Sequence, residues 1–453
     1  MGKTILFSPV GGTDPIAEKN MQDGSLLHIC RVYKPDTVIL YMSAEILEKH
    51  RKDNRYIECL ERLAAKQERK VTYQIIEKPD LQYVQKYDYF YTEYRDILFD
   101  ITDNMTAEDT LLLNVSSGTP AMKSSLIVLN TIGEFPAKMI QVYTPEEKMN
   151  EHEHSRNYAL DELWELNEDN KPGFINRCTE VSCPTLSDLM KYEIIKKHVG
   201  VYDYRAARGV AETLLASTKK EICDYLEMAE KRLLLVNNPI KGFRGAGMRF
   251  DYPVRQKEYA PFFEYALMVD IKYRRGEYGD FIRCITPLLV NLFDQIIQKQ
   301  FGLKVKDFCE YKRGGLCWSR RKLQNTPLEN VLQKRFSYDF KYGYLSSEAL
   351  LSIIEEMSEN IDLSELAEAL RSIEISIRNL AAHEVIAITE KKIKEETGYA
   401  ADEIVQFIKK GFTYTFVNAT AEQWRSYDDM NSILLDFMTE ASVRNTRLSA
   451  DEQ

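Results

Sequence analysis

The first 145 residues alternate short apolar runs with amphipathic stretches. Five runs are nearly continuous in apolar and β-branched residues, which is typical of strands in a parallel sheet covered on both faces. In the stretch before the fourth run, Tyr87, Tyr91, Tyr94, Leu98 and Ile101 recur at spacings of four and three, which predicts one buried helix face. The pattern predicts a doubly wound, Rossmann-like α/β domain over 1–150, whose sheet binds ligands at the carboxyl ends of its strands. The predicted strands span 4–9, 37–43, 71–76, 110–116 and 138–144.

The remainder of the chain has helical periodicity nearly to its end. Residues 151–184 turn polar and acidic, which indicates a connector with one short helix. An all-α region follows over 185–440, and residues 441–453 form a tail. The glycine-rich stretch 241–249 follows a leucine-rich helix rather than a strand, so we expect a loop between helices and not a phosphate-binding loop.

Composition narrows the classes of function. No run of about 18 apolar residues occurs, so we expect a cytoplasmic protein without a membrane segment. Eight cysteines without C-x-x-C spacing argue against both disulfides and a zinc site. His152 and His154 lie in the polar connector without a partner cluster, and a solvated linker is the better interpretation. No metal is therefore expected.

The net charge of −10 means that any RNA-binding surface must be a local patch of cations. Two stretches qualify, 272–275 and 312–322, and in the second Trp318 stands between cations where it could stack on a base. The alternative, a solvated charged face with Trp318 in the core, has the greater weight for either stretch alone.

Two strand ends carry residues suited to a ligand. After the first strand, Ser8, Gly11, Gly12, Thr13 and Asp14 supply hydroxyls, close-approach glycines and a carboxylate. The fourth strand is followed by Ser116, Ser117 and Thr119, where Thr119 and the next residue, proline, are typical of a helix N-cap and first turn. Amides at such a helix start favour phosphate oxygens. Ordinary strand-to-helix turns use the same residue types, and the residues alone do not decide between the two readings.

A second constellation lies in the helix predicted over 363–385. Leucines and isoleucines from Leu363 to Leu380 mark its buried stripe, and Arg378, Asn379 and His383 lie off it. Asn379 and His383 share a face, whereas Arg378 and His383 are five residues, or about 140°, apart. The spacing is weak evidence alone. A surface ion pair of Arg378 with Glu374 is an alternative explanation of this polar face.

Together the two constellations resemble the CARF–HEPN ribonucleases of type III CRISPR systems, in particular the Csm-series effectors of the III-A subtype. Residues 7–16 and 114–122 look like the two ligand-facing loops of the CARF sheet. The sequence Arg378-Asn379-x-x-x-His383 looks like the HEPN signature. The resemblance covers essentially the whole chain.

The resemblance implies a homodimer that a cyclic oligoadenylate switches on. It favours cyclic hexa-adenylate over tetra-adenylate and leaves open whether the CARF site degrades its activator. The HEPN pair would cut single-stranded RNA without metal by 2′-OH attack, leaving 2′,3′-cyclic phosphate ends. Arg378 would bind the phosphate, His383 would transfer protons or position the 2′-OH, and Asn379 would orient His383. The implied activator-binding residues are Ser8, Gly11, Gly12, Thr13, Asp14, Asn114, Ser116, Ser117, Gly118, Thr119 and Met122.

Two alternatives belong to other classes. The chain could be a non-catalytic, ligand-responsive regulator whose helical module binds protein or DNA, although its acidic charge and the lack of a basic recognition helix count against DNA. It could also be a nucleotide-using α/β enzyme with a helical dimerisation domain. Against that alternative, neither a G-x-G-x-x-G motif nor a P-loop follows the first strand.

Overall fold

A computed structural model describes residues 2–133, 135–144, 158–236, 242–312, 314–383 and 387–451. For 379–383 and 443–451 it describes the backbone without side chains. The side chains of Asn379 and His383, and the whole of His152 and His154, therefore lie outside the described part. The chain divides into two compact units, Met1–Ser187 and Asp188–Gln453, which we describe separately.

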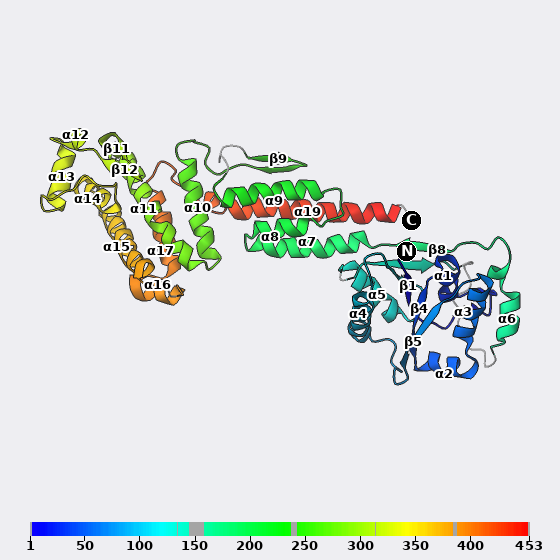
Figure 1. The fold of residues 1–453 in the computed structure, drawn as a ribbon. Helices are drawn as coiled ribbons and strands as arrows, with labels where there is room; N and C mark the ends of the chain where they lie inside the picture. Colours follow the sequence, from blue (N-terminus) through cyan, green and yellow to red (C-terminus); the bar gives the residue numbers. More distant parts are fainter. Residues whose placement is uncertain are drawn as a thin grey trace. The chain divides into compact units, whose positions relative to one another are not determined.

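The first unit is built on a six-stranded sheet in the order β5-β4-β1-β6-β7-β8 (Figure 1). The first five strands in this order are parallel, and β8 is antiparallel to β7. All five predicted strands are confirmed, with ends that differ by two residues or fewer. The strands are β1 (Thr4–Pro9), β4 (Thr37–Ser43), β5 (Thr72–Lys78), β6 (Thr110–Asn114), β7 (Ala137–Val142) and β8 (Cys178–Val181).

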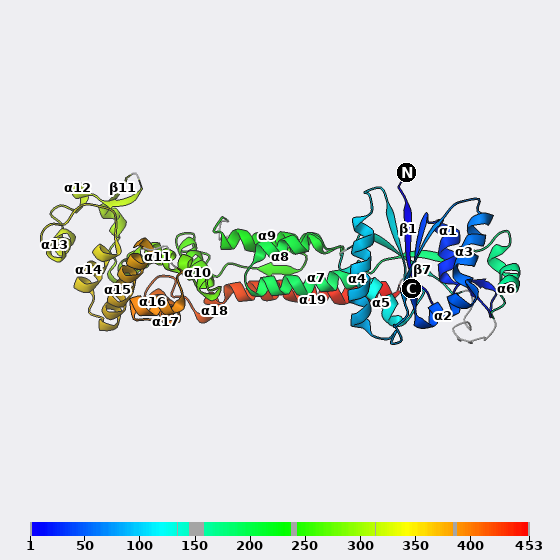
Figure 2. The same ribbon diagram turned by 60° about the horizontal axis from the view of Figure 1, so that its bottom comes forward.

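Helices cover both faces of this sheet because successive strand residues point to opposite sides. Leu6 packs with α1 (Ser25–Tyr33), α2 (Ala44–Asp53) and α3 (Arg55–Lys66), whereas Phe7 packs with α4 (Tyr87–Asp103) and α5 (Pro120–Thr131). Figure 2 shows α4 and α5 on one side of the strands and α1 and α3 on the other. The predicted face of α4 is correct for Tyr94 and Leu98, but Tyr87 is 55 % exposed and Phe90 is buried in its stead.

The described residues of the expected connector belong to the first unit. They form α6 (Leu160–Leu166), the short 3-10 helix η1 (Glu168–Asn170) and the edge strand β8. Leu163 of α6 is buried in the core, and β8 pairs with β7. The one short helix expected in the connector 151–184 is confirmed as α6, but the described residues from 158 on pack on the sheet instead of forming a free linker. Few but well-placed apolar residues in an acidic background suffice to dock this segment.

The second unit is helical apart from short hairpins, which agrees with the predicted fold class. The expected loop at 241–249 instead contains a hairpin whose turn, Ala246–Gly247, has positive φ at both residues. Residues 441–451 continue the last helix, so the expected tail is helical there. The long helices are α7 (Pro184–Gly200), α8 (Tyr204–Ala211), α9 (Lys219–Leu233), α10 (Ala260–Arg274), α11 (Tyr278–Phe301), α13 (Pro327–Arg335), α14 (Ser347–Met357), α15 (Ile361–His383), α16 (Glu390–Thr397), α17 (Ala401–Phe412) and α19 (Ser426–Asp451).

Shorter elements fill the connections between these helices. Among the described residues, none of the helices is both long and apolar enough to cross a bilayer. The shorter elements are β2 (Ile16–Ala17), β3 (Gln22–Asp23), β9 (Phe243–Gly245), β10 (Met248–Phe250), η2 (Val305–Phe308), β11 (Cys309–Lys312), β12 (Gly315–Trp318), α12 (Arg320–Leu323) and α18 (Ala421–Trp424).

A fully buried arginine ties three helices of the second unit together. Arg232 of α9 forms a two-point ion pair with Glu264 of α10, with N–O distances of 2.8 and 3.1 Å. It also donates to the hydroxyl of Ser426 in α19 at 2.7 Å, and its guanidinium lies 3.9 Å from the ring centre of Tyr427. Removal of either charge would leave its partner uncompensated in the core.

Candidate functional site

The predicted ligand loops meet at the point where the sheet changes its direction of winding. From β1 the chain proceeds to β4 on one side, and from β6 to β7 on the other. Doubly wound sheets bind ligands in the crevice at such a switch point. The structure brings the two loops into contact there, since Asn114 Nδ2 donates to Ser8 Oγ at 2.9 Å.

Buried polar residues form a scaffold between these loops. The Asn114 carboxamide oxygen accepts hydrogen bonds from the amides of Ser116 (3.0 Å) and Ser117 (3.3 Å). Asp14 accepts from the Ser117 hydroxyl and from the amide of Gly11 at 3.0 Å. Burial raises the pKa of Asp14, although these hydrogen bonds oppose the shift. Four residues predicted to bind a ligand thus hold the loops in place from within: Ser8, Asp14, Asn114 and Ser117.

Two glycines allow the loops to approach so closely. A Cβ added to Gly11 would lie 2.8 Å from Ser117 Oγ and 2.9 Å from the Gly118 amide nitrogen. Gly118 has φ +86°, and a Cβ there would lie 2.8 Å from the sulfur of the buried Met122. Both positions therefore require glycine.

Fewer of the predicted ligand-binding residues are exposed than the sequence suggested. Gly12 and Thr13 are exposed, whereas Gly11, Ser116, Gly118 and Thr119 are half-buried. Thr119 Oγ1 caps α5 by accepting from the Met122 amide at 3.4 Å, and it donates to a backbone carbonyl at 2.7 Å. The start of α5 adds positive partial charge to this edge. Hydroxyls, backbone amides and a helix start suit the phosphates and riboses of a nucleotide.

One residue of this scaffold was missed by sequence reasoning. Ser25, the first residue of α1, accepts a hydrogen bond from Asn114 Nδ2 at 3.3 Å. It follows Gly24, where a Cβ would lie 2.5 Å from Asp14 Oδ1. A glycine–serine pair before an apolar helix was the available signal, but its proximity to Asn114 depends on the tertiary fold.

The second predicted site lies on α15. The expected apolar stripe is confirmed where side chains are described, since Leu363, Leu366, Leu370, Ile373 and Ile377 are all buried. The helical backbone continues through position 383, so the arginine and histidine of the predicted motif share one helix. The leucine at position 380 lies outside the described side chains.

Arg378 is held by a carboxylate from the core rather than from the surface. Its Nη2 lies 2.7 Å from Oε1 of Glu374, which is fully buried, while the arginine side chain is 48 % exposed. Glu374 also pairs with Arg371 at 3.0 Å and accepts from the hydroxyl of Ser347 in α14. On its other side, Arg378 Nε donates to Thr286 Oγ1 of α11 at 3.3 Å. The expected ion pair between Arg378 and Glu374 is present. Because Glu374 is buried, the pair holds the half-exposed guanidinium of Arg378 in one orientation.

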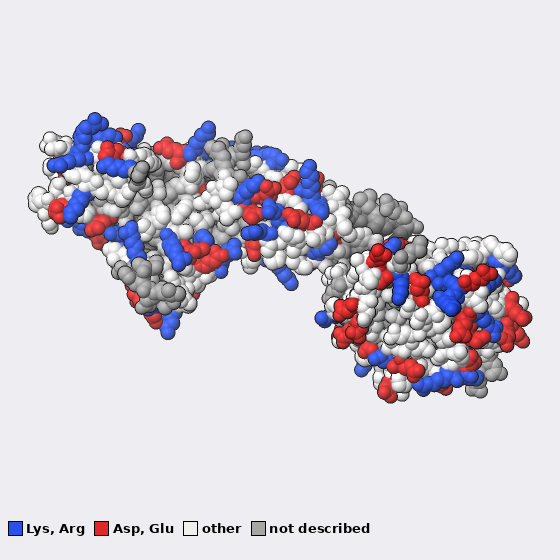
Figure 3. Space-filling view, viewed as in Figure 1, with Lys and Arg blue, Asp and Glu red and all other residues white. Residues whose placement is uncertain are grey.

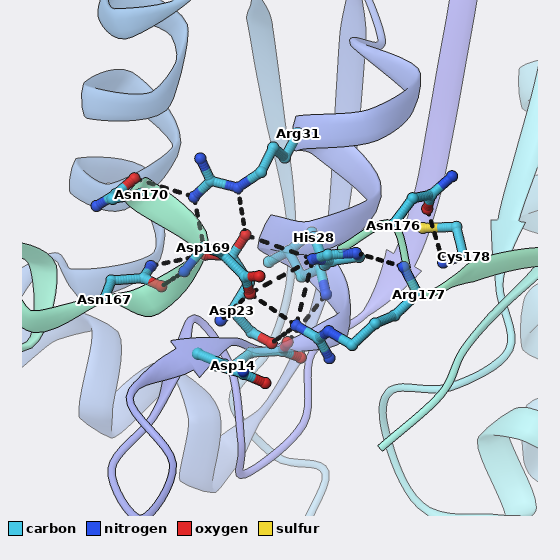
Figure 4. A network of polar contacts seen from close by, with 12 residues as sticks. Asp14, Asp23, His28, Arg31, Asn167, Asp169, Asn170, Asn176, Arg177 and Cys178 are labelled. Carbon is cyan, nitrogen blue, oxygen red and sulfur yellow. Dashed lines mark hydrogen bonds and ion pairs between the residues drawn. The ribbon is translucent and has the colours of Figure 1, made fainter. Parts of the chain in front are cut away.

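A third cluster resembles a metal site by residue type (Figure 4). Potential ligand atoms of Asp23, His28 and Asp169 lie within 4.8 Å of one another. Arg31, however, donates twice to Asp23, at 2.6 and 2.9 Å, and Arg177 Nη2 lies 2.8 Å from Asp169. The Arg177 amide also donates to His28 Nε2 at 3.0 Å. These groups are already paired with cations and donors, so the cluster fits a structural joint and not a metal centre.

This joint explains how the polar segment before β8 is fastened. Arg177 and Asp169 come from that segment, whereas Asp23 and His28 belong to β3 and α1. Burial raises the pKa of Asp169, but hydrogen bonds from His28 and the Asp23 amide and the charge of Arg177 outweigh it and bring the pKa to about 2. The carboxylate is therefore ionised over the physiological range and contributes to stability.

Comparison with known proteins defines the class first. Three family models match successive parts of the chain and place it among proteins that join a CARF domain to a HEPN domain. They are described as the Cas_Csm6 CARF domain (residues 72–178), the CRISPR-associated protein Csm6 6H domain (181–233) and the Cas_Csm6 HEPN domain (251–435).

Full-length relatives then define the family. The chain is 30 % identical over 411 residues to the CRISPR system endoribonuclease Csm6 of Mycobacterium tuberculosis, which covers 90 % of this chain and 94 % of that protein. It is 26 % identical over 440 residues to Csm6′ of Streptococcus thermophilus, covering 95 % and 98 %. The chain therefore belongs to the Csm6 family of CRISPR system endoribonucleases. The resemblance inferred from the sequence is confirmed, and the alternative of a non-catalytic regulator is set aside.

A solved structure shares the fold. Enterococcus italicus Csm6 bound to cyclic hexa-2′-fluoro-hexa-dAMP superimposes with a TM-score of 0.71 at 17 % sequence identity. The match covers 96 % of this chain and 100 % of that one.

Proposed function

We propose that this endoribonuclease cuts single-stranded RNA without a metal ion and is activated by a cyclic oligoadenylate bound at the β1–β6 edge. The observation that carries the proposal is Arg378, which the buried Glu374 holds half-exposed on the helix that also contains His383. A guanidinium in that position suits the oxygens of a phosphodiester.

The reaction needs only proton transfer and charge stabilisation. The 2′-oxygen forms a bond to the adjacent phosphorus while the bond from phosphorus to the 5′-oxygen breaks, giving a 2′,3′-cyclic phosphate and a 5′-OH. One proton leaves the 2′-OH and one reaches the 5′-oxygen. His383, with an ordinary pKa of about 6.5, suits either transfer at neutral pH. Arg378 stabilises the negative charge that builds up on the phosphate, and Asn379 orients His383.

Each protomer contributes only one histidine to this chemistry. An isologous dimer that brings two α15 helices together supplies two histidines and two arginines around one phosphate. We therefore propose a homodimer as the active unit.

For the activator we propose a contact surface centred on Gly12, Thr13 and Ser116. The buried Ser8, Asp14, Asn114 and Ser117 act as positioning residues behind it, together with Gly11, Gly118, Thr119 and Met122. Cyclic hexa-adenylate is favoured over tetra-adenylate, because the relative with the same fold was solved with a cyclic hexanucleotide analogue.

One assay tests the proposal. The full chain is mixed with labelled single-stranded RNA and EDTA, with cyclic hexa-adenylate, cyclic tetra-adenylate or neither. We expect cleavage only with activator, 2′,3′-cyclic phosphate ends, and none of this cleavage in His383→Ala. Failure of both rings to induce cutting, or full activity in His383→Ala, would refute it. Following the activator by chromatography shows in the same samples whether the ring is degraded.

Thr13→Ala tests the sensor separately. Thr13 is exposed and the substitution leaves the buried scaffold intact, so we expect a higher activator concentration at half-maximal cleavage with an unchanged maximal rate. Thr119→Ala is a poorer test because it also removes the cap of α5. An unchanged activator response in Thr13→Ala would contradict the proposed contact surface.

A further inference from the structure

Positive charge is concentrated in one segment of the second unit. Residues 304–341 contain ten lysines and arginines against four aspartates and glutamates, in a chain whose net charge is −10. All the cations of this stretch that the structure describes are exposed. Figure 3 shows lysines and arginines gathered over α12 and the β11–β12 hairpin. We call residues 304–344 the basic segment.

The basic segment differs in part from the other candidate patch, because some of its cations have no carboxylate partner, whereas five are paired: Lys306, Lys312, Lys334, Arg335 and Lys341. At 272–275 each of the three cations is matched by a carboxylate, so that patch is neutralised. The pairs are Lys272–Asp280 (3.0 Å), Arg274–Asp270 (2.8 Å) and Arg275–Glu277 (2.9 Å). In the basic segment, neither Arg320 nor Arg321 has a carboxylate within ion-pair distance among the described residues. Lys322 donates to the carbonyl of Cys309 at 2.6 Å and also has no carboxylate within ion-pair distance in the described part of the chain.

Exposed tyrosines are interleaved with these cations. Trp318 is only 1 % exposed, so the indole that the sequence offered for stacking belongs to the core. Tyr311, Tyr338 and Tyr344 are instead 86 %, 82 % and 58 % exposed. Proteins that bind single-stranded RNA without sequence preference combine two features. Cations contact the phosphates of the RNA backbone, and aromatic rings stack on the bases.

The basic segment ends beside the residues that hold Arg378. Tyr344 precedes Ser347 by three residues, which places their Cα atoms within about 10 Å. Ser347 donates to Glu374, and Glu374 pairs with Arg378. A strand lying on the basic segment can therefore continue to the cleavage site on the same unit.

We propose that the basic segment is a binding surface for the substrate RNA outside the cleavage site. The inference rests on the proposed function, because it assigns the substrate of that site to a second surface. A single-stranded RNA fits better than a second copy of this chain, because an isologous contact would oppose two segments that each carry a net charge of +6 by sequence.

The test compares RNA affinity at several salt concentrations in the full chain carrying His383→Ala, with cyclic hexa-adenylate present. The triple variant Lys312→Ala/Arg320→Ala/Arg321→Ala should bind a long single-stranded RNA at least about tenfold more weakly. Its slope of log affinity against log salt should shrink by about 2, from roughly 0.7 per phosphate contact. Tyr311→Ala/Tyr338→Ala should weaken binding roughly 30-fold or more and leave the slope unchanged.

The matched control is Lys220→Ala/Lys257→Ala, which removes two exposed cations elsewhere in the second unit. It should leave affinity and slope unchanged. In a chain that retains His383, the triple variant should cleave a tetranucleotide at the wild-type rate, because so short a strand does not span both surfaces.

Each outcome decides between readings. Unchanged affinity and slope in the triple variant would overturn the inference, as would a change in its mass in solution, which would make the surface a protein interface. Weakened binding in a chain that cuts no RNA with either activator would support the surface while refuting the proposed function. Activator-dependent cutting together with unaltered RNA binding in the triple variant would support the proposed function and refute the binding surface.

Discussion

Glu374→Gln is the sharpest probe of the site because it removes a buried charge behind Arg378 and retains the shape of the side chain. Glutamine still offers one oxygen to the Ser347 hydroxyl. That oxygen also keeps the hydrogen bond from Arg371, which uses the same carboxylate oxygen as Ser347. The NH2 group of glutamine replaces Oε1 and faces Arg378 Nη2, so a donor would face a donor. Arg378 would then lose the contact that orients it toward a phosphate.

The magnitude follows from the exposure of the two arginines. Arg371 is 12 % exposed, and its hydrogen bond falls from about 1.5–3 kcal/mol with a charged acceptor to about 0.5–1.5 kcal/mol with a neutral one, a loss of about 1–1.5 kcal/mol. The Arg378 side chain is 48 % exposed, so solvent screening reduces its share to about 0.5 kcal/mol. We expect Glu374→Gln to lower the free energy of unfolding by about 1.5–2 kcal/mol, a fall in Tm of about 3–8 °C. Loss of orientation should lower kcat by about 10- to 100-fold.

The assay measures cleavage of labelled RNA at saturating activator and at a temperature below the unfolding range. Tm is measured on the same samples. Glu348→Gln is the matched control, since Glu348 pairs with the same Arg371 at 3.4 Å but is 47 % exposed. We expect it to cost less than about 0.5 kcal/mol and to leave kcat unchanged. A wild-type kcat in Glu374→Gln, or an equal loss in Glu348→Gln, would refute the positioning role.

Three further variants test the rest of the structure. The pKa of Asp169 is lowered to about 2 from its ordinary value near 3.8, so the stability that its carboxylate contributes is present above about pH 4 and lost as pH falls toward 2. Asp169→Asn should lower the free energy of unfolding by about 2 kcal/mol at pH 7 and abolish this acid-dependent part, as measured by urea unfolding at several pH values. Gly118→Ala strains a residue at φ +86° and should lower stability by about 1–2 kcal/mol and raise the activator requirement, whereas an unchanged activator response would show that the loop contact is not needed. Arg232→Met leaves Glu264 buried without its cation and should cost about 3–5 kcal/mol by denaturant unfolding, and a loss under 1 kcal/mol would contradict the buried pair.

The sequence was most informative where burial is continuous. Strands β1 and β4 were predicted to the residue because parallel strands covered on both faces must be apolar along their length. The stripe of α15 was equally clear. The meeting of the loops after β1 and β6 followed from topology, because carboxyl ends of parallel strands lie at one edge of the sheet.

Prediction failed where a few contacts outweigh composition. β8 is short, half-exposed and set in an acidic background, yet the ion pair between Arg177 and Asp169 fastens the segment before it. Trp318 stood among cations but is buried in the core. In both cases the environment is supplied by residues distant in sequence.

The sequence by itself determined the architecture, the two loops and the helix that carries Arg378 and His383, because periodicity and turn chemistry are local properties. Only the tertiary structure decided which loop residues are exposed at the edge of the sheet and which brace the loops from within. It also decided that Glu374 lies in the core: the spacing of four predicts its pairing with Arg378, but the burial that turns the pair into an orienting device depends on α11 and α14 packing around it.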